Sequence, residues 1–185
     1  MMSQMSKQKS ENAKRGVEGE AAFKAWLDTH HFSYVALCQK SENFAAAFSG
    51  HVKRPDFLVL LESVGLIAVD VKNYSQSHIP QYRDSITLEV ESEVRASIAF
   101  ERLFRIPLWY AYVDHDGQND QSSWHWISAL HAVEIGTIKT RNADDIQFYV
   151  IERADCAHVI TGDDIAKLYL CRAPSHAGLN SVALK

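Results

Sequence analysis

Cysteine is scarce in this sequence. Among 185 residues there are three cysteines, Cys38, Cys156 and Cys171, and no two of them form a Cys-x-x-Cys pair. An odd number of widely spaced thiols gives neither a disulfide framework nor a zinc knuckle. We therefore expect reduced thiols that are mostly buried. The histidines also lack a His-Glu-x-x-His pattern, so the sequence predicts no zinc site.

Long apolar runs are absent as well. No stretch approaches the ~20 uninterrupted apolar residues that a membrane-spanning helix needs. The opening segment, MMSQMSKQKSENAKRG, lacks the apolar core of a secretory signal. The sequence thus predicts a cytoplasmic protein without a membrane partner. It also lacks the glycine-rich loop with Gly-Lys-Ser/Thr that binds ATP phosphates, so an ATP-driven activity is not supported.

The chain has no excess of positive charge. Its formal net charge is -4: residues 1–113 carry 13 basic and 13 acidic side chains, whereas residues 114–185 carry 6 and 10. This balance counts against strong non-specific binding to DNA. A phosphate-binding surface is expected only on the first part, where basic residues are available. These are Lys14, Arg15, Lys53, Arg54, Arg83, Arg95, Arg102 and Arg105.

What the chain does contain is the composition of an ordinary globular domain, with 46% hydrophobic and 23% charged residues. Apolar periodicity predicts a mixed α/β order. The expected elements are helix 16–32, strands 32–38, 57–62 and 66–72, helix 89–105 and strand 106–114, then strands 124–130 and 146–152 and helix 161–170. The strands at 57–62 and 66–72 are apolar on both faces, so we expect both faces of the sheet to be covered.

Three charged residues, Asp56, Asp70 and Lys72, interrupt the most apolar stretch of the chain, RPDFLVLLESVGLIAVDVKNY. If the chain reverses near Val64, antiparallel partners have numbers that sum to about 126 to 128. Asp56 then lies opposite Asp70 or one position along. The two-residue period of a strand places Lys72 on the same face as Asp70.

Two carboxylates at this spacing need compensation. At ~4 Å they would repel by ~4 kcal/mol at an effective dielectric constant of about 20. Lys72 offsets part of this repulsion, and a divalent cation held by both acids offsets more. Carboxylate oxygens are hard ligands that suit Mg²⁺ or Mn²⁺. The alternative is a simple ion pair between Asp70 and Lys72 at a sheet end, but the position of Asp56 favours a site.

Pro55-Asp56, then a hairpin, then Asp70-Val71-Lys72 resembles the PD-(D/E)XK nuclease superfamily, whose members share a core of helix, three strands, helix and strand. The resemblance covers residues 14–113. It implies an α/β, restriction-endonuclease-like core, with a central mixed sheet flanked by helices. Residues 1–13 are expected to form a flexible arm, and residues 114–185 a C-terminal α/β extension packed on the same domain.

The segment GVEGEAAFKAWL is similar to the first helix of that family, whose acid is matched here by Glu20. Glu20 is favoured over Glu18 because Phe23 and Leu27 follow it at three and seven residues, on the inward stripe of the helix. A solvated acid in the first helical turn is the alternative.

The resemblance implies Mg²⁺- or Mn²⁺-dependent hydrolysis of phosphodiester bonds in nucleic acid, with DNA the favoured substrate and an endonuclease favoured over an exonuclease. Asp56, Asp70, Glu20 and the Val71 carbonyl would hold one or two ions. Lys72 would orient the attacking water, or act as a base if burial lowers its pKa enough.

Several functions stay open at this level. Repair or recombination, restriction and mobile-element defence all fit the family. Paired cuts would need a homodimer or a partner subunit. A different class of function is an inactive module that keeps the nuclease fold and binds nucleic acid or assembles proteins. Two tryptophans in WHWIS, Trp124 and Trp126, could stack on bases, although packing in the core is favoured for one or both.

Overall fold

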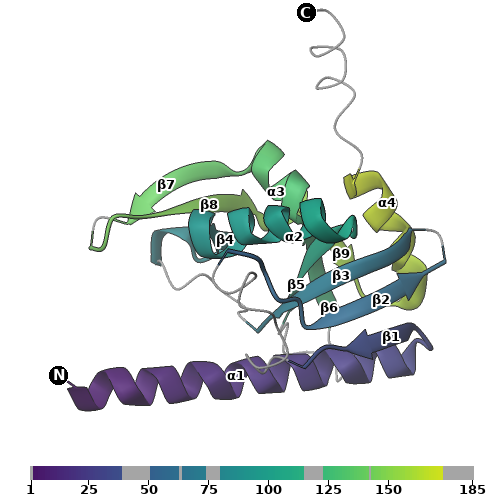
Figure 1. The fold of residues 1–185 in the computed structure, drawn as a ribbon, viewed down its shortest axis with the longest axis horizontal. Coiled ribbons are helices and arrows are strands. Elements are labelled where there is room, and N and C mark those ends of the chain that lie inside the picture. Colours follow the sequence, from purple (N-terminus) through teal and green to yellow (C-terminus); the bar gives the residue numbers. More distant parts are fainter. Residues whose placement is uncertain are drawn as a thin grey trace, which may run out of the picture.

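A six-stranded sheet forms the centre of the molecule (Figure 1). The computed structural model describes residues 2–38, 51–62, 64–73, 80–114, 123–141 and 143–172. In spatial order the strands of the central sheet are β1 (Ser33–Ala36), β2 (Phe57–Leu61), β3 (Gly65–Lys72), β5 (Leu108–Asp114), β6 (Ser123–Ser128) and β9 (Ala157–Val159). The sheet is mixed, because β3 and β5 run parallel while the other neighbours are antiparallel.

A second sheet and several helices complete the fold. The second sheet has the order β4 (Ser85–Glu89), β8 (Ile146–Glu152) and β7 (Thr137–Arg141). The longer helices are α1 (Met2–Thr29), α2 (Ala96–Phe104), α3 (Ala129–Ile135) and α4 (Ala166–Arg172). Short turns of helix are η3 (Pro80–Tyr82), the π-helical η4 (Val90–Arg95), η5 (Arg153–Asp155) and η6 (Gly162–Ile165).

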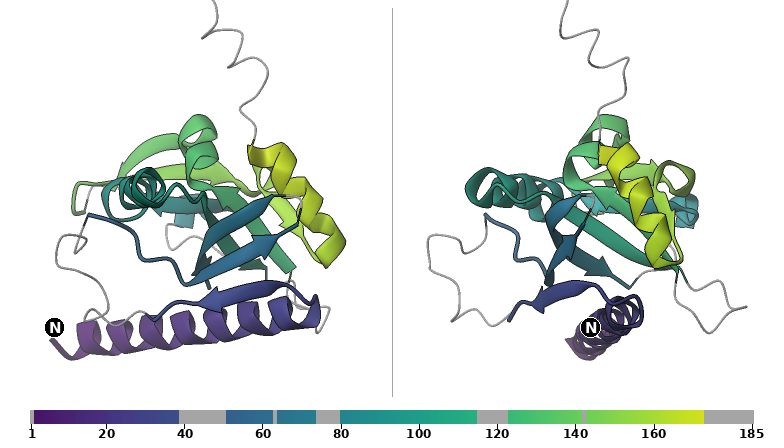
Figure 2. Two further views of the ribbon diagram at one scale, coloured as in Figure 1. Left: turned by 45° about the vertical axis from the view of Figure 1, so that its right-hand side comes forward. Right: turned by 90° about the vertical axis from the view of Figure 1, so that its right-hand side faces the viewer.

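Each face of the central sheet has its own apolar core. On one face, Phe23, Trp26 and Leu27 of α1 and Leu168 of α4 pack on alternate residues of β2, β3, β5 and β6. On the other face, α2, α3 and the second sheet cover the intervening residues. Helix α1 runs along one side of the molecule beside β1, and α2 and α3 lie on the opposite side (Figures 1 and 2). The prediction that both sheet faces are covered is therefore confirmed.

The hairpin of β2 and β3 has the predicted register. Phe57 is the partner of Val69, and Leu61 is the partner of Gly65, so partner numbers sum to 126. Gly65 has a φ of 92°, a conformation that glycine adopts without the steric cost of a Cβ atom. Asp56, just before β2, donates its backbone N–H to the Val69 carbonyl and so lies one position along from Asp70, one of the two placements predicted from the sequence.

Residues 1–13 were predicted to form a flexible arm, and the structure assigns residues 2–13 to α1, which begins at Met2. This segment is rich in Met, Gln, Lys and Glu, all good helix formers. Once a helix is nucleated, adding such residues costs little. Residues 39–50, predicted as part of a loop, lie outside the described residues.

The predicted boundary between core and extension also needs correction. Strand β5 ends at Asp114, and two strands of the extension, β6 and β9, continue the central sheet beyond it. Strands β6 and β9 of the predicted extension are thus part of the central sheet, whereas β7 and β8 belong to the second sheet. Strands β4 and β7 were not predicted, and the predicted strand 124–130 ends at Ser128, whose side chain accepts a hydrogen bond from the His131 N–H at the start of α3.

The exposure of individual side chains settles two smaller expectations. Trp124 and Trp126 are fully buried, so they belong to the core and cannot stack on bases. Cys156 is buried, whereas Cys38 is exposed, and the side chain of Cys171 lies outside the described residues. In the ranges that the structure covers, no helix is both long enough and apolar enough to cross a membrane.

Candidate active site

Asp56 lies immediately before β2. Its backbone N–H donates a 2.8 Å hydrogen bond to the Val69 carbonyl. Its side-chain Oδ2 accepts a 2.7 Å hydrogen bond from the Val71 N–H. The carboxylate is therefore held by the backbone of the residue that follows Asp70, which brings the two acids of the predicted motif together.

Asp70 is the most buried acid of the group and has two lysine partners. Its residue exposure is 5%. Lys53 Nζ lies 3.0 Å from Oδ1, and Lys72 Nζ lies 3.0 Å from Oδ2. The second contact is an ion pair without hydrogen-bond geometry, so Oδ2 is buried without a hydrogen bond among the described residues. A buried oxygen of this kind is an available ligand atom.

Lys72 has a second partner in Glu93, which comes from the π-helical turn η4. The Glu93 Oε1 atom forms an ion pair with Lys72 Nζ, and Oε2 accepts a 2.8 Å hydrogen bond from the Glu89 N–H. π-Helical turns are rare and occur frequently at functional sites. Here the turn fixes a carboxylate against the amine of the predicted motif.

These partners decide the protonation state of Lys72. Burial alone lowers the pKa of its amine, but the carboxylates of Asp70 and Glu93 raise it more, so the pKa lies well above the ordinary lysine value. The side chain is an ammonium at neutral pH. From the sequence, Lys72 could act as a base only if burial lowered its pKa enough, and the paired acids shift the pKa in the opposite direction.

For two of the three acids, the surroundings shift the pKa in the direction that opposes ionisation. Burial raises the pKa of Asp56 to about 7, and the charges of Asp70 and Glu20 add to this effect, although the Val71 hydrogen bond opposes it. Burial and the Asp70 charge likewise raise the pKa of Glu20. For Asp70, burial raises the pKa, but Lys72 and Lys53 outweigh it, so the pKa is lowered. Asp70 is thus the acid of the group that ionises most readily.

Glu20 reaches the site from α1, which packs on the other face of the sheet at the end of β3. Gly19 and Asn73 form the point of contact, and Asn73 Nδ2 donates a 2.7 Å hydrogen bond to the Arg15 carbonyl. Glu18, the alternative acid, is 57% exposed at its side chain and pairs with Lys14. The structure therefore places Glu20, and not Glu18, beside the aspartates.

The close approach at Gly19 gives a testable expectation. A Cβ atom on Gly19 would lie 2.7 Å from Asn73 Cβ, so Gly19→Ala forces α1 away from β3 and should destabilise the fold by about 1 to 3 kcal/mol. Gly16→Ala, in the same helix, meets nothing within 4 Å and should stabilise the protein by up to about 1 kcal/mol. Thermal denaturation of both variants checks this. Equal effects would show that α1 does not depend on the Gly19 contact.

The structure thus brings the four predicted side chains, Glu20, Asp56, Asp70 and Lys72, to one end of the β2–β3 hairpin. Asp70 and Lys72 share the sheet face that carries Tyr110 and Tyr112, their partners in β5. The Val71 side chain points to the opposite face and packs against the core formed with α1. Three acids and one ammonium at a single, largely buried locus can hold a divalent cation and stabilise a charged reactant.

Two further residues of this site were not predicted as part of it. Lys53 appeared only as one of several basic residues, and Glu93 lay within the predicted helix 89–105 without a role of its own. Glu93 had one usable signal: a Glu four residues after Glu89 at a helix start can bond back to a free N–H group.

Comparison of the chain with models of known protein families, with curated proteins and with solved structures finds no match in any of the three.

Proposed function

We propose that the protein is a metal-dependent nuclease of the PD-(D/E)XK type that hydrolyses phosphodiester bonds in nucleic acid, with DNA as the substrate and internal cleavage as the mode. The observation that carries this proposal is the meeting of Asp56 and Asp70, held by one backbone hydrogen bond at Val71, with the Lys72 ammonium 3.0 Å from Asp70. Residues of the sequence motif therefore also contact one another in the fold.

The donor set fits Mg²⁺ or Mn²⁺. The candidate ligands are the oxygens of Asp56, Asp70 and Glu20, with the Val71 carbonyl as a further one, and hard divalent cations prefer such oxygens. Burial is the main cause of the raised pKa values of Asp56 and Glu20, and the charges of neighbouring acids add to it. A bound cation would favour the ionised form of both acids.

The reaction follows from the roles that these side chains can take. A bound Mg²⁺ would lower the pKa of water and neutralise charge on the phosphate. Asp56 and Asp70 hold their positions through the hairpin backbone, so little reorganisation is needed. The Lys72 ammonium, fixed between Asp70 and Glu93, would donate a hydrogen bond to the attacking water or to a phosphate oxygen. Glu93 holds the Lys72 side chain through an ion pair, so we assign it as a positioning residue.

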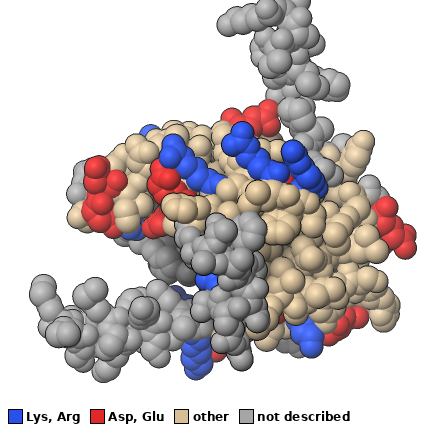
Figure 3. Space-filling model, viewed as in Figure 1, with Lys and Arg blue, Asp and Glu red and all other residues tan. Residues whose placement is uncertain are grey.

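Basic side chains near α2 supply a surface for the nucleic-acid backbone. Arg95, Arg102 and Arg105 lie in or next to α2 and are exposed. Figure 3 shows basic side chains gathered on the upper part of this face. The Lys53 N–H also donates a hydrogen bond to the Ala96 carbonyl at the start of α2, which links this helix to the site. Phosphate contacts of this kind orient a duplex without reading its sequence.

The proposal is tested by incubating the protein with end-labelled linear duplex, single-stranded DNA, flap, four-way junction and RNA, in Mg²⁺, Mn²⁺ or EDTA. We expect cleavage of at least one DNA substrate that requires the metal and is lost in Asp70→Asn. Asp155→Asn, an exposed acid outside the site, is the matched control. Cleavage that persists in EDTA, or in Asp70→Asn, would contradict the proposal.

One observation favours the second candidate, an inactive module with a nuclease-like fold. Both oxygens of Asp70 already face lysine ammonium groups, so the buried charge is partly neutralised without a metal. Calorimetric titration with Mg²⁺ separates the two. Binding that is lost in Asp70→Asn supports the enzyme, whereas no binding to the wild-type protein supports the module.

The same contact predicts the effect of removing Lys53. In Lys53→Met the ammonium that competes for Asp70 Oδ1 is gone, while the length of the side chain is kept. We expect Mg²⁺ to bind about three- to tenfold more tightly, the equivalent of ~0.7 to 1.4 kcal/mol. Lys24→Met, exposed on α1, should bind as the wild type does. Weaker binding in Lys53→Met would mean that Lys53 supports the metal site.

A further inference from the structure

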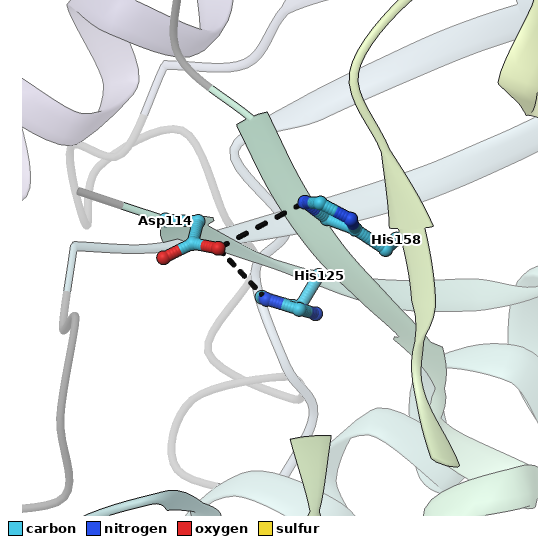
Figure 4. Close-up of side chains that lie close together, drawn as sticks. All are labelled: Asp114, His125 and His158. Carbon is cyan, nitrogen blue, oxygen red and sulfur yellow. Dashed lines mark hydrogen bonds and ion pairs between the residues drawn. The ribbon is translucent and has the colours of Figure 1, made fainter. Parts of the chain in front are cut away.

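A second cluster of potential metal ligands lies on the same sheet. It consists of Asp114 at the end of β5, His125 in β6 and His158 in β9 (Figure 4). His125 and His158 are direct partners across β6 and β9. Tyr112 is the partner of His125, so Asp114, two residues further along β5, is its diagonal neighbour on the same face. Three adjacent strands therefore present one carboxylate and two imidazoles together.

We propose that Asp114, His125 and His158 bind a divalent first-row transition metal, of which Zn²⁺ is the ion to test. Asp114 Oδ2 lies 3.0 Å from His125 Nε2 and 3.8 Å from His158 Nε2, and one ligand atom from each residue lies within 4.8 Å of the others. Ligands at ~2.0 to 2.2 Å from a tetrahedral Zn²⁺ are ~3.3 to 3.6 Å apart. The two separations from Asp114 Oδ2, 3.0 and 3.8 Å, lie just below and just above this range.

The surroundings leave ligand atoms available. The side chains of Asp114 and His125 are 11% and 12% exposed. The Nε2 atom of His158 is buried, faces Asp114, and has no hydrogen-bond partner among the residues that the structure describes. Buried polar atoms normally have a partner, and one without a partner in a cluster of this kind is available to bind an ion. The two imidazole rings stack with centroids 4.7 Å apart and planes 16° apart, which keeps both Nε2 atoms near the carboxylate.

Arg153 holds the carboxylate from the other side. Its Nη1 atom lies 3.7 Å from Asp114 Oδ1, the oxygen that does not face the histidines. Such outer partners orient ligating carboxylates in metal sites. Two imidazoles and one carboxylate suit Zn²⁺ or Fe²⁺ better than Mg²⁺, and three protein ligands leave a fourth position open to water or a ligand.

This site is separate from the proposed Mg²⁺ site. Lys72, Tyr112, His125 and His158 form one row across β3, β5, β6 and β9. Neighbouring strands are ~4.8 Å apart, so His125 lies about 10 Å from Lys72. The two ions of a dinuclear centre are only ~3.5 to 4 Å apart. The cluster therefore cannot supply the second ion of the nuclease site, and the proposal does not depend on nuclease activity.

Linear spacing could not reveal this site. The ligands are separated by 11 and 33 positions and come from three strands, whereas the sequence rule looks for histidines on one helix or in one loop. The expectation of no zinc site rested on that rule alone. The observed register of β5, β6 and β9 brings the three ligands together, so this expectation can now be tested.

Zinc binding is measured by competition with a chromophoric chelator, in excess Mg²⁺ so that the acidic site is occupied. We expect one equivalent of Zn²⁺ per chain, with affinity reduced at least about 100-fold in His158→Gln and in His125→Gln. His131→Gln, Cys38→Ser and Asp70→Asn should bind as the wild type does. Unchanged affinity in both histidine variants, or loss in Cys38→Ser or Asp70→Asn instead, would overturn the assignment.

A measurement on the wild-type protein avoids any folding defect of the variants. The visible spectrum of the Co²⁺-substituted protein should show the intense bands of a four-coordinate site, without the charge-transfer band of a thiolate ligand. His158 is 41% exposed at its side chain, so His158→Gln is the variant expected to fold normally. A spectrum of six-coordinate aqueous Co²⁺ would contradict the proposal.

Discussion

Replacing Lys72 by methionine is expected to lower the rate of metal-dependent DNA cleavage by about 10²- to 10³-fold, the usual cost of losing one charge-stabilising donor. The ammonium lies 3.0 Å from Asp70 Oδ2 and also pairs with Glu93. Lys53, the other ammonium at Asp70, contacts Oδ1 instead, so we expect it to replace Lys72 only in part. Mg²⁺ binding should survive, because Asp56, Asp70 and Glu20 are unchanged. Single-turnover cleavage and calorimetry on the same variant separate the two effects.

Lys72→Met leaves the half-buried Glu93 without its cation. Breaking a fully buried pair costs about 3 to 5 kcal/mol, so we expect a smaller loss of stability here. The double variant Lys72→Met/Glu93→Gln removes both charges and should recover much of this stability. It should remain as inactive as the single variant. Lys139→Met, exposed on β7, controls for loss of a surface lysine. Cleavage at the wild-type rate by the stable double variant would show that Lys72 has no part in the reaction.

Asp56→Asn should stabilise the metal-free protein at pH 8 while abolishing metal binding. Burial raises the pKa of Asp56 from 3.8 to about 7 in the folded protein. The folded state therefore holds this proton more tightly than the unfolded state. Between pH 4 and 7, stability falls as pH rises, because folding opposes ionisation of the carboxyl. At pH 8 the full penalty is present, up to ~4 kcal/mol for a shift of this size.

Asparagine removes this penalty and keeps an oxygen that can accept the Val71 N–H bond. Denaturant unfolding in EDTA should show Asp56→Asn to be more stable than the wild type at pH 8, and the difference should shrink to less than half at pH 5. Asp155→Asn, on the surface, should show no such pH dependence. A variant that is less stable than the wild type at pH 8 would mean that the Asp56 carboxylate is compensated in the metal-free state. A gain of stability with a loss of function is typical of a strained active site.

The core of the candidate site could be predicted because it depends on local geometry. A hairpin with a short turn fixes its own register, and the two-residue period of a strand then determines which side chains share a face. Asp56, Asp70 and Lys72 follow from these two rules. Glu20 followed from helical periodicity, but its place beside Asp70 depends on the Gly19–Asn73 contact, which periodicity does not specify.

The remaining features depend on tertiary packing. Lys53 precedes the hairpin in an irregular segment, and its reach to Asp70 is set by its backbone bond to the start of α2. Glu93 faces Lys72 only because η4 is π-helical, whereas a regular helix at 89–105 was predicted. Strand β4, with the sequence SITLE, is short and became visible only through its pairing with β8. The place of β6 and β9 in the central sheet likewise required the observed pairings.

The most direct test of the metal site is crystallographic. Crystals of the wild-type protein soaked in Mn²⁺ should show an anomalous difference peak within coordination distance of the carboxylates of both Asp56 and Asp70, and this peak should vanish in Asp70→Asn crystals. Mn²⁺ that binds only at Asp114, His125 and His158, or an Asp56–Asp70 pair that stays bridged to Lys53 with no peak at saturating Mn²⁺, would contradict the account.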